Sequence, residues 1–336
     1  MRYLLSTDKR IKMLSDWPSM LLTFAVCLLC WVAGYVYSIG FPMAEYSAVL
    51  PLWGMLCDFL GGKLIVYLLG LSLIVLVAFV IQRISDRNML IRERTRLPFM
   101  LFILLISTNS ELLSVKEITI VLLCLVFMIY ELFNTYQLPE ATGRLFNAGV
   151  LIGVSGLFIP QLLFVMPLLW IGMYQFRSLS IKSFAASLMG MLIVYWFVLA
   201  WCVWEHDFSM FSSLFSSIAK FDIISTSILF RYHYVGFAGV VLLLIMALVH
   251  IKSDALSNSV RVRLMFSFLL NMSAWSLVMI FLYSNHIDTF SAILYLPVSV
   301  LAAYFLKNLR YVFRFALYYT MLIILSASFI MRIWNF

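Results

Sequence analysis

The sequence predicts an all-α protein, a polytopic bundle of about eleven transmembrane helices that forms a single domain over residues 1–336. Composition is the first reason, because 64% of the residues are apolar and 11% are charged, whereas an average soluble domain is about half apolar and about a quarter charged. The second reason is that windows of roughly 20 apolar residues, enough for a helix to cross about 30 Å of hydrocarbon, recur from Pro18 onward. These runs are continuously apolar, which excludes a transmembrane β-barrel.

The first apolar run follows a basic N-terminal segment, as the apolar region of a signal peptide does. Its length of roughly 20 residues is too great for a cleavable signal, so we expect the first span there. Later apolar runs supply the other spans. The predicted spans are residues 18–39, 64–82, 97–108, 118–132, 145–159, 161–174, 183–204, 234–250, 264–284, 290–306 and 315–332.

Two consecutive pairs of these spans are short, 97–108 with 118–132 and 145–159 with 161–174. Helices of roughly 12–16 residues reach only about 18–24 Å. We therefore expect two hairpins that dip deeply into the membrane, cross it where it is thinned, or are shielded by protein. Alternatively, each pair is one long kinked helix.

Basic residues gather on one side of this arrangement. With the N-terminus in the cytoplasm, the cytoplasmic segments hold all but five of the 23 Lys and Arg residues. The five others are Lys63, Lys116, Lys220, Arg231 and Arg332. This positive-inside distribution predicts a multi-pass protein of a bacterial inner membrane with a cytoplasmic N-terminus. It accounts for the net charge of +8 without a nucleic-acid partner, and the expected partner is the lipid bilayer. No protein partner is indicated.

Sequence signatures of soluble enzymes are absent. We find no dinucleotide fingerprint, no P-loop, no H-E-x-x-H and no G-x-S-x-G, and the four histidines lack metal-ligand spacing. Cys27 and Cys30 form a C-x-x-C that lies inside the first span, where packing is the expected role. We therefore expect neither a metal nor a cofactor. The spans also lack central ionisable groups, which disfavours an ion-coupled transporter, although a transporter remains one alternative.

Small residues four apart predict two points of close helix packing. Gly149 with Gly153, and Ala186 with Gly190, form steps of this kind. Such steps allow two helix backbones to approach closely.

Two segments on the predicted outer side are longer than turns, residues 40–63 and 205–222. The first is too apolar for a solvated loop and too polar for a span. The second places phenylalanines at helical spacing with serines opposite them. Both are therefore predicted to be interfacial helices on the outer side, where we expect any working surface to lie.

Four residues of the outer side are candidate site residues. Glu45 follows the first span in apolar surroundings, where desolvation would strengthen it as a general base, and Asp58 is a second candidate acid. Arg231 and His233 precede a later span and are candidates for holding a phosphate. The alternative is that Glu45 is a solvated or capping carboxylate and that Arg231 extends to lipid headgroups.

The motif Ala44-Glu45-Tyr46, which follows an outward first span, resembles the first outer loop of C-type-fold glycosyltransferases that use lipid-linked sugars. Those enzymes often carry an acidic pair before the aromatic residue, whereas this chain has one acid. The resemblance implies glycosyl transfer from a polyprenyl-phosphate-linked sugar at the outer face. A non-catalytic membrane scaffold or assembly factor is the alternative from a different functional class.

Residues from about 60 to 200 are also similar to a bacterial family of multi-pass inner-membrane proteins of unknown function. The likeness rests on Asn147-Ala148-Gly149, Pro160 and Arg177-Ser178-Leu179-Ser180, together with the short paired spans. It implies the architecture and brings no activity with it.

The charge distribution predicts the sidedness of the loops. In a variant without native cysteines, single cysteines at Ser209 and Asn285 should react in intact cells with a membrane-impermeant thiol reagent, whereas one at Ser257 should not. Labelling at Ser257 in intact cells would contradict this orientation.

Overall fold

The protein is described here by a computed structural model that places residues 17–39, 62–93, 95–109, 112–138, 140–206, 234–254, 258–309 and 311–334. Within these ranges it is all-α, as predicted. The α-helices are α2 (Trp17–Ile39), α4 (Lys63–Arg87), α5 (Leu97–Ser107), α6 (Glu117–Phe133), α7 (Thr142–Phe158), α8 (Val165–Gln175), α9 (Ile181–Glu205), α12 (Tyr234–Ser253), α13 (Val260–Leu282), α14 (Ile287–Asn308) and α15 (Tyr311–Trp334). Two short 3-10 helices, η2 (Pro160–Phe164) and η3 (Ser284–His286), precede α8 and α14.

Seven of these helices, namely α2, α4, α9, α12, α13, α14 and α15, are long and apolar enough to cross a membrane. The chain is therefore an integral, multi-pass membrane protein. The remaining helices, α5 to α8, have 11 or 17 residues, so complete crossing by these four stays a prediction.

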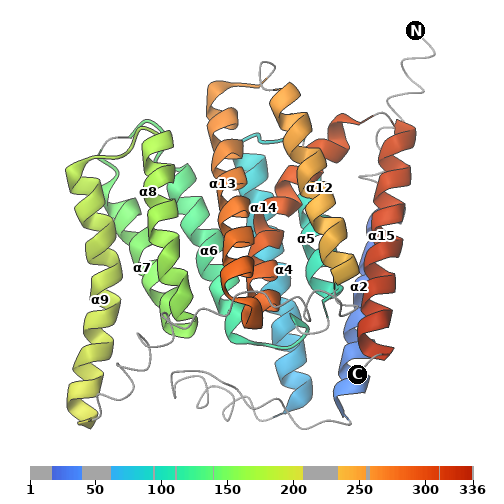
Figure 1. The fold of residues 1–336 in the computed structure, drawn as a ribbon, viewed down its shortest axis with the longest axis horizontal. Helices are drawn as coiled ribbons and strands as arrows, with labels where there is room; N and C mark the ends of the chain where they lie inside the picture. Colours follow the sequence, from blue (N-terminus) through green and yellow to red (C-terminus); the bar gives the residue numbers. More distant parts are fainter. Residues whose placement is uncertain are drawn as a thin grey trace.

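Consecutive α-helices run in alternating directions, so the bundle has two ends (Figure 1). We call the end where α4, α6, α8, α12 and α14 finish the basic end, and the opposite one the far end. The basic end carries Arg83, Arg87, Arg92, Arg96, Arg144, Arg177, Lys182, Lys252, Arg261, Arg263, Lys307 and Arg314. Described basic residues of the far end are Lys63, Lys116 and Arg332. The orientation of the protein in the membrane was predicted from this difference in the number of basic residues between the two ends.

The short helix α5 is surrounded by protein. All of its residues except Phe99 are buried, although a helix of this length rises only about 16 Å. It packs against α4, α14 and α2. The buried position agrees with the expectation that short spans are shielded by protein, because backbone groups at their ends would be costly in hydrocarbon.

The helices of each short pair are separate. A 3-10 helix and the extended residue Ile159 (φ −134°, ψ 96°) interrupt the chain between α7 and α8. Helices α5 and α6 run in opposite directions, since α5 begins and α6 ends at the basic end (Figure 1). The alternative of one kinked helix per pair does not describe either pair.

Helix α14 forms the centre of the bundle and α9 lies at its edge (Figure 1). In the apolar window of α14, 94% of the residues are buried, compared with 17% for α9. The outward face of α9 presents Trp196, Trp201 and Trp204, toward its far end. Tryptophan favours the interface between hydrocarbon and headgroups, so these side chains are suited to anchoring α9 in lipid.

Helices α7 and α9 run parallel and touch backbone to backbone through the predicted small residues. A Cβ atom added at Gly149 would lie 2.1 Å from the carbonyl oxygen of Ser187, and one at Gly190 would lie 2.2 Å from that of Phe146. Gly153 faces Val194 in the same contact. The two steps therefore form one helix pair.

The predicted interfacial helices at 40–63 and 205–222 fall almost entirely outside the described residues. Of the first, Gly62 is the N-cap of α4 and Lys63 its first residue. Of the second, Glu205 ends α9 and His206 caps it with a positive φ of 56°. Both interfacial helices therefore stay predictions.

Replacing Gly149 by alanine should destabilise the protein by about 1–3 kcal/mol, because the added methyl group collides with the backbone of α9. The sign is informative, since alanine in a helix interior is otherwise about 1 kcal/mol better than glycine. Thermal unfolding of the detergent-purified variants measures the effect.

The matched control is Gly143→Ala in the same helix, where an added Cβ meets nothing within 4 Å. This variant should be as stable as the original or slightly more so. Equal midpoints for the two variants would contradict the close contact of α7 with α9.

Candidate functional site at the far end

The four predicted site residues Glu45, Asp58, Arg231 and His233 lie outside the described residues. Their chain neighbours at the ends of described helices are Ile39, Gly62 and Tyr234, and all three lie at the far end of the bundle (Figure 1). The described residues of that end are therefore the ones nearest in sequence to the predicted site residues.

A buried polar cluster occupies the far end of the central helices. Arg332 of α15 donates hydrogen bonds from Nη1 to Oδ1 of Asn109 and, at 3.3 Å, to Oδ1 of Asp288. Asn109 follows α5, and its Nδ2 donates to the same Asp288 oxygen at 3.0 Å. Tyr295 of α14 interacts with the side chains of Asn109 and Ser291. We call Asn109, Asp288, Tyr295 and Arg332 the far-end cluster.

Local sequence positions the two charges of this cluster. Asp288 lies in the first turn of α14 and Arg332 in the last turn of α15. A carboxylate is stabilised at a helix N-terminus and a cation at a C-terminus, because the helix dipole has the opposite sign there. The antiparallel arrangement of α14 and α15 then places these two ends side by side.

The cluster is buried to different degrees. Asn109 is 2% exposed, and the side chain of Arg332 is 11% exposed. The side chain of Asp288 is 42% exposed. Burying a guanidinium is costly unless it is paired and hydrogen-bonded, and here one carboxylate and one amide oxygen compensate it. Asp288 is thus the accessible member of an otherwise enclosed group.

Helices α2 and α4, which flank the first outer segment in the sequence, contact the residues that follow Asn109. A Cβ at Gly34, in the last turns of α2, would lie 2.4 Å from Cδ1 of Leu113. On α4, a Cβ at Gly70 would lie 3.0 Å from the backbone nitrogen of Val115. Both helices therefore press on residues 112–115, which follow Asn109 closely in the chain.

Helix α12, the described helix that begins directly after Arg231 and His233 in the chain, contacts α15 near the cluster. A Cβ at Gly236, in the first turn of α12, would lie 2.9 Å from Oγ of Ser328 on α15. Ser328 precedes Arg332 by about one helical turn. Helices α2, α4 and α12, the described helices nearest in sequence to the four predicted site residues, therefore contact residues 112–115 or α15 close in the chain to members of the cluster.

The sequence places Arg332 among the five basic residues outside the predicted cytoplasmic segments, but it does not show that Arg332 pairs with Asp288. An acid at the start of one helix and a base at the end of another could have been noticed in the sequence, but this does not show which acid pairs with which base. Nothing in the sequence pointed to Asn109, because an isolated asparagine after an apolar run is an ordinary turn residue. Among the described residues, no group of three or more His, Cys, Asp or Glu side chains is placed to hold a metal ion.

Comparison with known proteins gives one match. The model of a family of unknown function (DUF6427) matches residues 48–335. No curated protein and no solved structure matches the chain.

Replacing Arg332 by methionine should destabilise the protein by about 1–3 kcal/mol, because Asp288 and Asn109 lose their shared donor in a partly buried site. Adding Asp288→Asn to this variant should restore part of the loss, since it removes the uncompensated charge. Unfolding midpoints of the single and double variants form the mutant cycle.

The control is Lys182→Met, which breaks an ion pair with Glu140 whose side chains are 78% and 83% exposed. Its midpoint should hardly change, because exposed pairs contribute little. An Arg332→Met protein as stable as this control would show that the far-end cluster does not stabilise the fold.

Proposed function

The chain belongs to the DUF6427 family, and since that family brings no activity with it, we propose a function from the residues themselves: a glycosyltransferase-like reaction on a polyprenyl-phosphate-linked sugar at the far end of the bundle. The observation that carries the proposal is that α2, α4 and α12, the described helices nearest in sequence to Glu45 and Arg231, contact α15 or the residues that follow Asn109, and so lie near the far-end cluster. The positive-inside pattern supports placing this end on the outer side of a bacterial inner membrane.

A substrate of this class suits an integral membrane protein. Its polyprenyl tail stays in the hydrocarbon, while its phosphate and sugar lie at the interface, so the reacting groups must be met at a helix end. Ionisable groups enclosed among transmembrane helices are costly and mark functional sites by default. Arg332, whose side chain is 11% exposed, is such a group at this end, and Asp288 is its more accessible partner.

Each predicted site residue has a role in this proposal. Glu45 takes the proton of the acceptor hydroxyl, and Asp58 is the second candidate acid of the same segment. Arg231 and His233 hold the phosphate of the donor lipid.

In the proposed reaction the acceptor hydroxyl attacks the anomeric carbon of the sugar. The bond between that carbon and the phosphate oxygen breaks, so that polyprenyl phosphate leaves with the bonding electron pair. The hydroxyl proton passes to the Glu45 carboxylate.

A non-catalytic scaffold is the competing function, and one observation favours it. Asp288, Asn109 and Arg332 satisfy one another, as the members of a purely structural cluster do. The two functions differ in what they require of Glu45, because a scaffold needs its shape and an enzyme needs its carboxylate.

Replacing Glu45 by glutamine keeps the size of the side chain and removes the base. The proposed reaction predicts wild-type abundance together with a loss of transfer of labelled sugar from the polyprenyl-linked donor in membranes, by a factor of about 10²–10⁴. It also predicts failure to complement a deletion strain at native expression.

The control is Glu140→Gln, an exposed carboxylate of the basic end, which should leave both measurements unchanged. If Glu45→Gln complements the deletion fully, the catalytic assignment is wrong and the scaffold function takes its place.

A further inference from the structure

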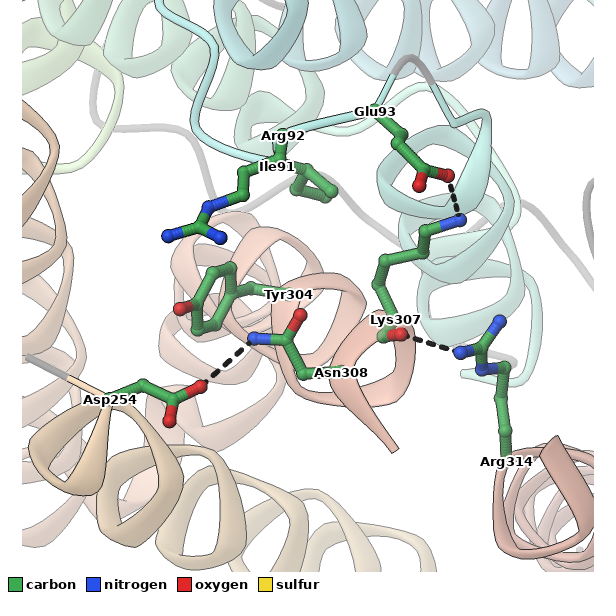
Figure 2. Close-up of a pocket in the computed structure, with 8 residues that line it drawn as sticks. All are labelled: Ile91, Arg92, Glu93, Asp254, Tyr304, Lys307, Asn308 and Arg314. Carbon is green, nitrogen blue, oxygen red and sulfur yellow. Dashed lines mark hydrogen bonds and ion pairs between the residues drawn. The ribbon is translucent and has the colours of Figure 1, made fainter. Parts of the chain in front are cut away.

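A polar cavity lies at the basic end, away from the far-end cluster. Its volume is about 310 Å³, and its wall combines the loop after α4 with the ends of α12 and α14 and the start of α15 (Figure 2). The lining residues are Ile91, Arg92, Glu93, Asp254, Tyr304, Lys307, Asn308 and Arg314. Ligand sites in proteins begin at about this size, so the cavity suits a small group.

Two of its cations are more deeply buried than the positive-inside pattern requires. Arg314 is 6% exposed, and the side chain of Lys307 is 13% exposed. Basic residues that only determine topology keep their charged groups in water or among headgroups. Burying two cations around a cavity is costly unless anionic groups compensate them.

The charge of the largely buried Lys307 is balanced by a carboxylate that is itself mostly exposed. Its ammonium pairs with the carboxylate of Glu93, whose side chain is 63% exposed (Figure 2). Glu93 can therefore turn outward into water at little cost, whereas Lys307 stays enclosed. The pair resembles an occupied anion site in which the protein supplies its own anion.

Some of the N–H donors of Arg314 are used within the described part of the protein, and one is not. Its Nη2 donates to the carbonyl oxygens of Lys307 at 2.6 Å and Leu309 at 2.9 Å, which caps the end of α14. Its buried Nε has no hydrogen-bond partner among the residues that the structure describes. A guanidinium offers five N–H donors, and a buried donor without an acceptor is a cost that a ligand oxygen would remove.

The other side of the cavity is held in place. Asn308 donates to Asp254 at 3.3 Å, and Asn258 donates to the Tyr304 hydroxyl at 2.6 Å. Asp254 also lies 3.2 Å from His250, so its carboxylate is engaged within the protein. Glu93 is thus the carboxylate whose exposure leaves it free to be displaced.

We propose that this cavity binds a phosphate group, which displaces Glu93 from Lys307 and is held by Lys307 and Arg314. With Glu93 turned away, the two largely buried cations Lys307 and Arg314 remain at the cavity, and their charge matches that of a phosphate monoester, about −1.5 to −2. The site lies at helix ends, so the phosphate could belong to an anionic lipid headgroup or to a small soluble molecule. The proposal does not rest on the function proposed for the far end.

The test measures binding to the full-length protein in neutral detergent. One arm titrates phosphatidic acid, and the other titrates glycerol 3-phosphate, which has the phosphate and no acyl chains; ligand-induced stabilisation against heating reports affinity in both. Glu93→Gln should tighten binding about threefold or more, because it removes the internal competitor. Lys307→Gln should weaken it about tenfold or more, because a charge-assisted contact is lost.

Matched controls come from the exposed Lys182–Glu140 pair of the same end. Lys182→Gln and Glu140→Gln should leave affinity unchanged. Tighter binding by Glu93→Gln cannot result from misfolding, so it supports the site even if Lys307→Gln folds poorly. Response to phosphatidic acid alone assigns the phosphate to a lipid, and response to both ligands assigns it to a soluble molecule. Unchanged or weaker binding by Glu93→Gln in both arms, or equal effects of Lys307→Gln and Lys182→Gln, would overturn the proposal.

Discussion

The cost of an unsatisfied backbone group in hydrocarbon governs this architecture. Each such group costs several kcal/mol, so a helix shorter than the membrane is tolerated only where protein covers its ends. Helix α5 has 11 residues and is buried along nearly its whole length. The long helices α2, α4 and α14 around it supply that cover. The central position of α14 and the enclosed polar residue after α5 both follow from this requirement.

The helices could be predicted from the sequence because every membrane-spanning segment needs a sufficiently long run of apolar residues. A run of apolar residues of sufficient length is a span whatever its neighbours are, and each predicted span corresponds to a helix of the structure. Boundaries were less accurate. Helix α4 continues to Arg87, beyond the predicted end at residue 82, because Gln82 binds Asp86 at 2.9 Å and Arg87 lies over the ring of Tyr130. Those contacts depend on the folded bundle.

The polar sites could not be predicted in the same way, because they join distant parts of the chain. Asp288 meets Arg332 across two helices and Asn109 across most of the sequence. The pairing of Lys307 with Glu93 likewise brings an early loop to a late helix. Each residue looks ordinary in its own segment, and only the packing of the bundle decides which polar groups share a cavity. The residues chosen from the sequence, Glu45, Asp58, Arg231 and His233, remain hypotheses because they lie outside the described residues.

The order of these elements along the chain has a consequence for biogenesis. Helix α5 ends about 180 residues before α14 begins, yet the two pack together at the centre of the protein. At a synthesis rate of roughly 5–20 residues per second, α5 waits about 10–40 s for its main neighbour. During that interval its uncovered ends need another shelter, such as the insertion machinery or a chaperone. Assembly of the core is therefore largely post-insertional, with the last third of the chain closing over a helix made in the first.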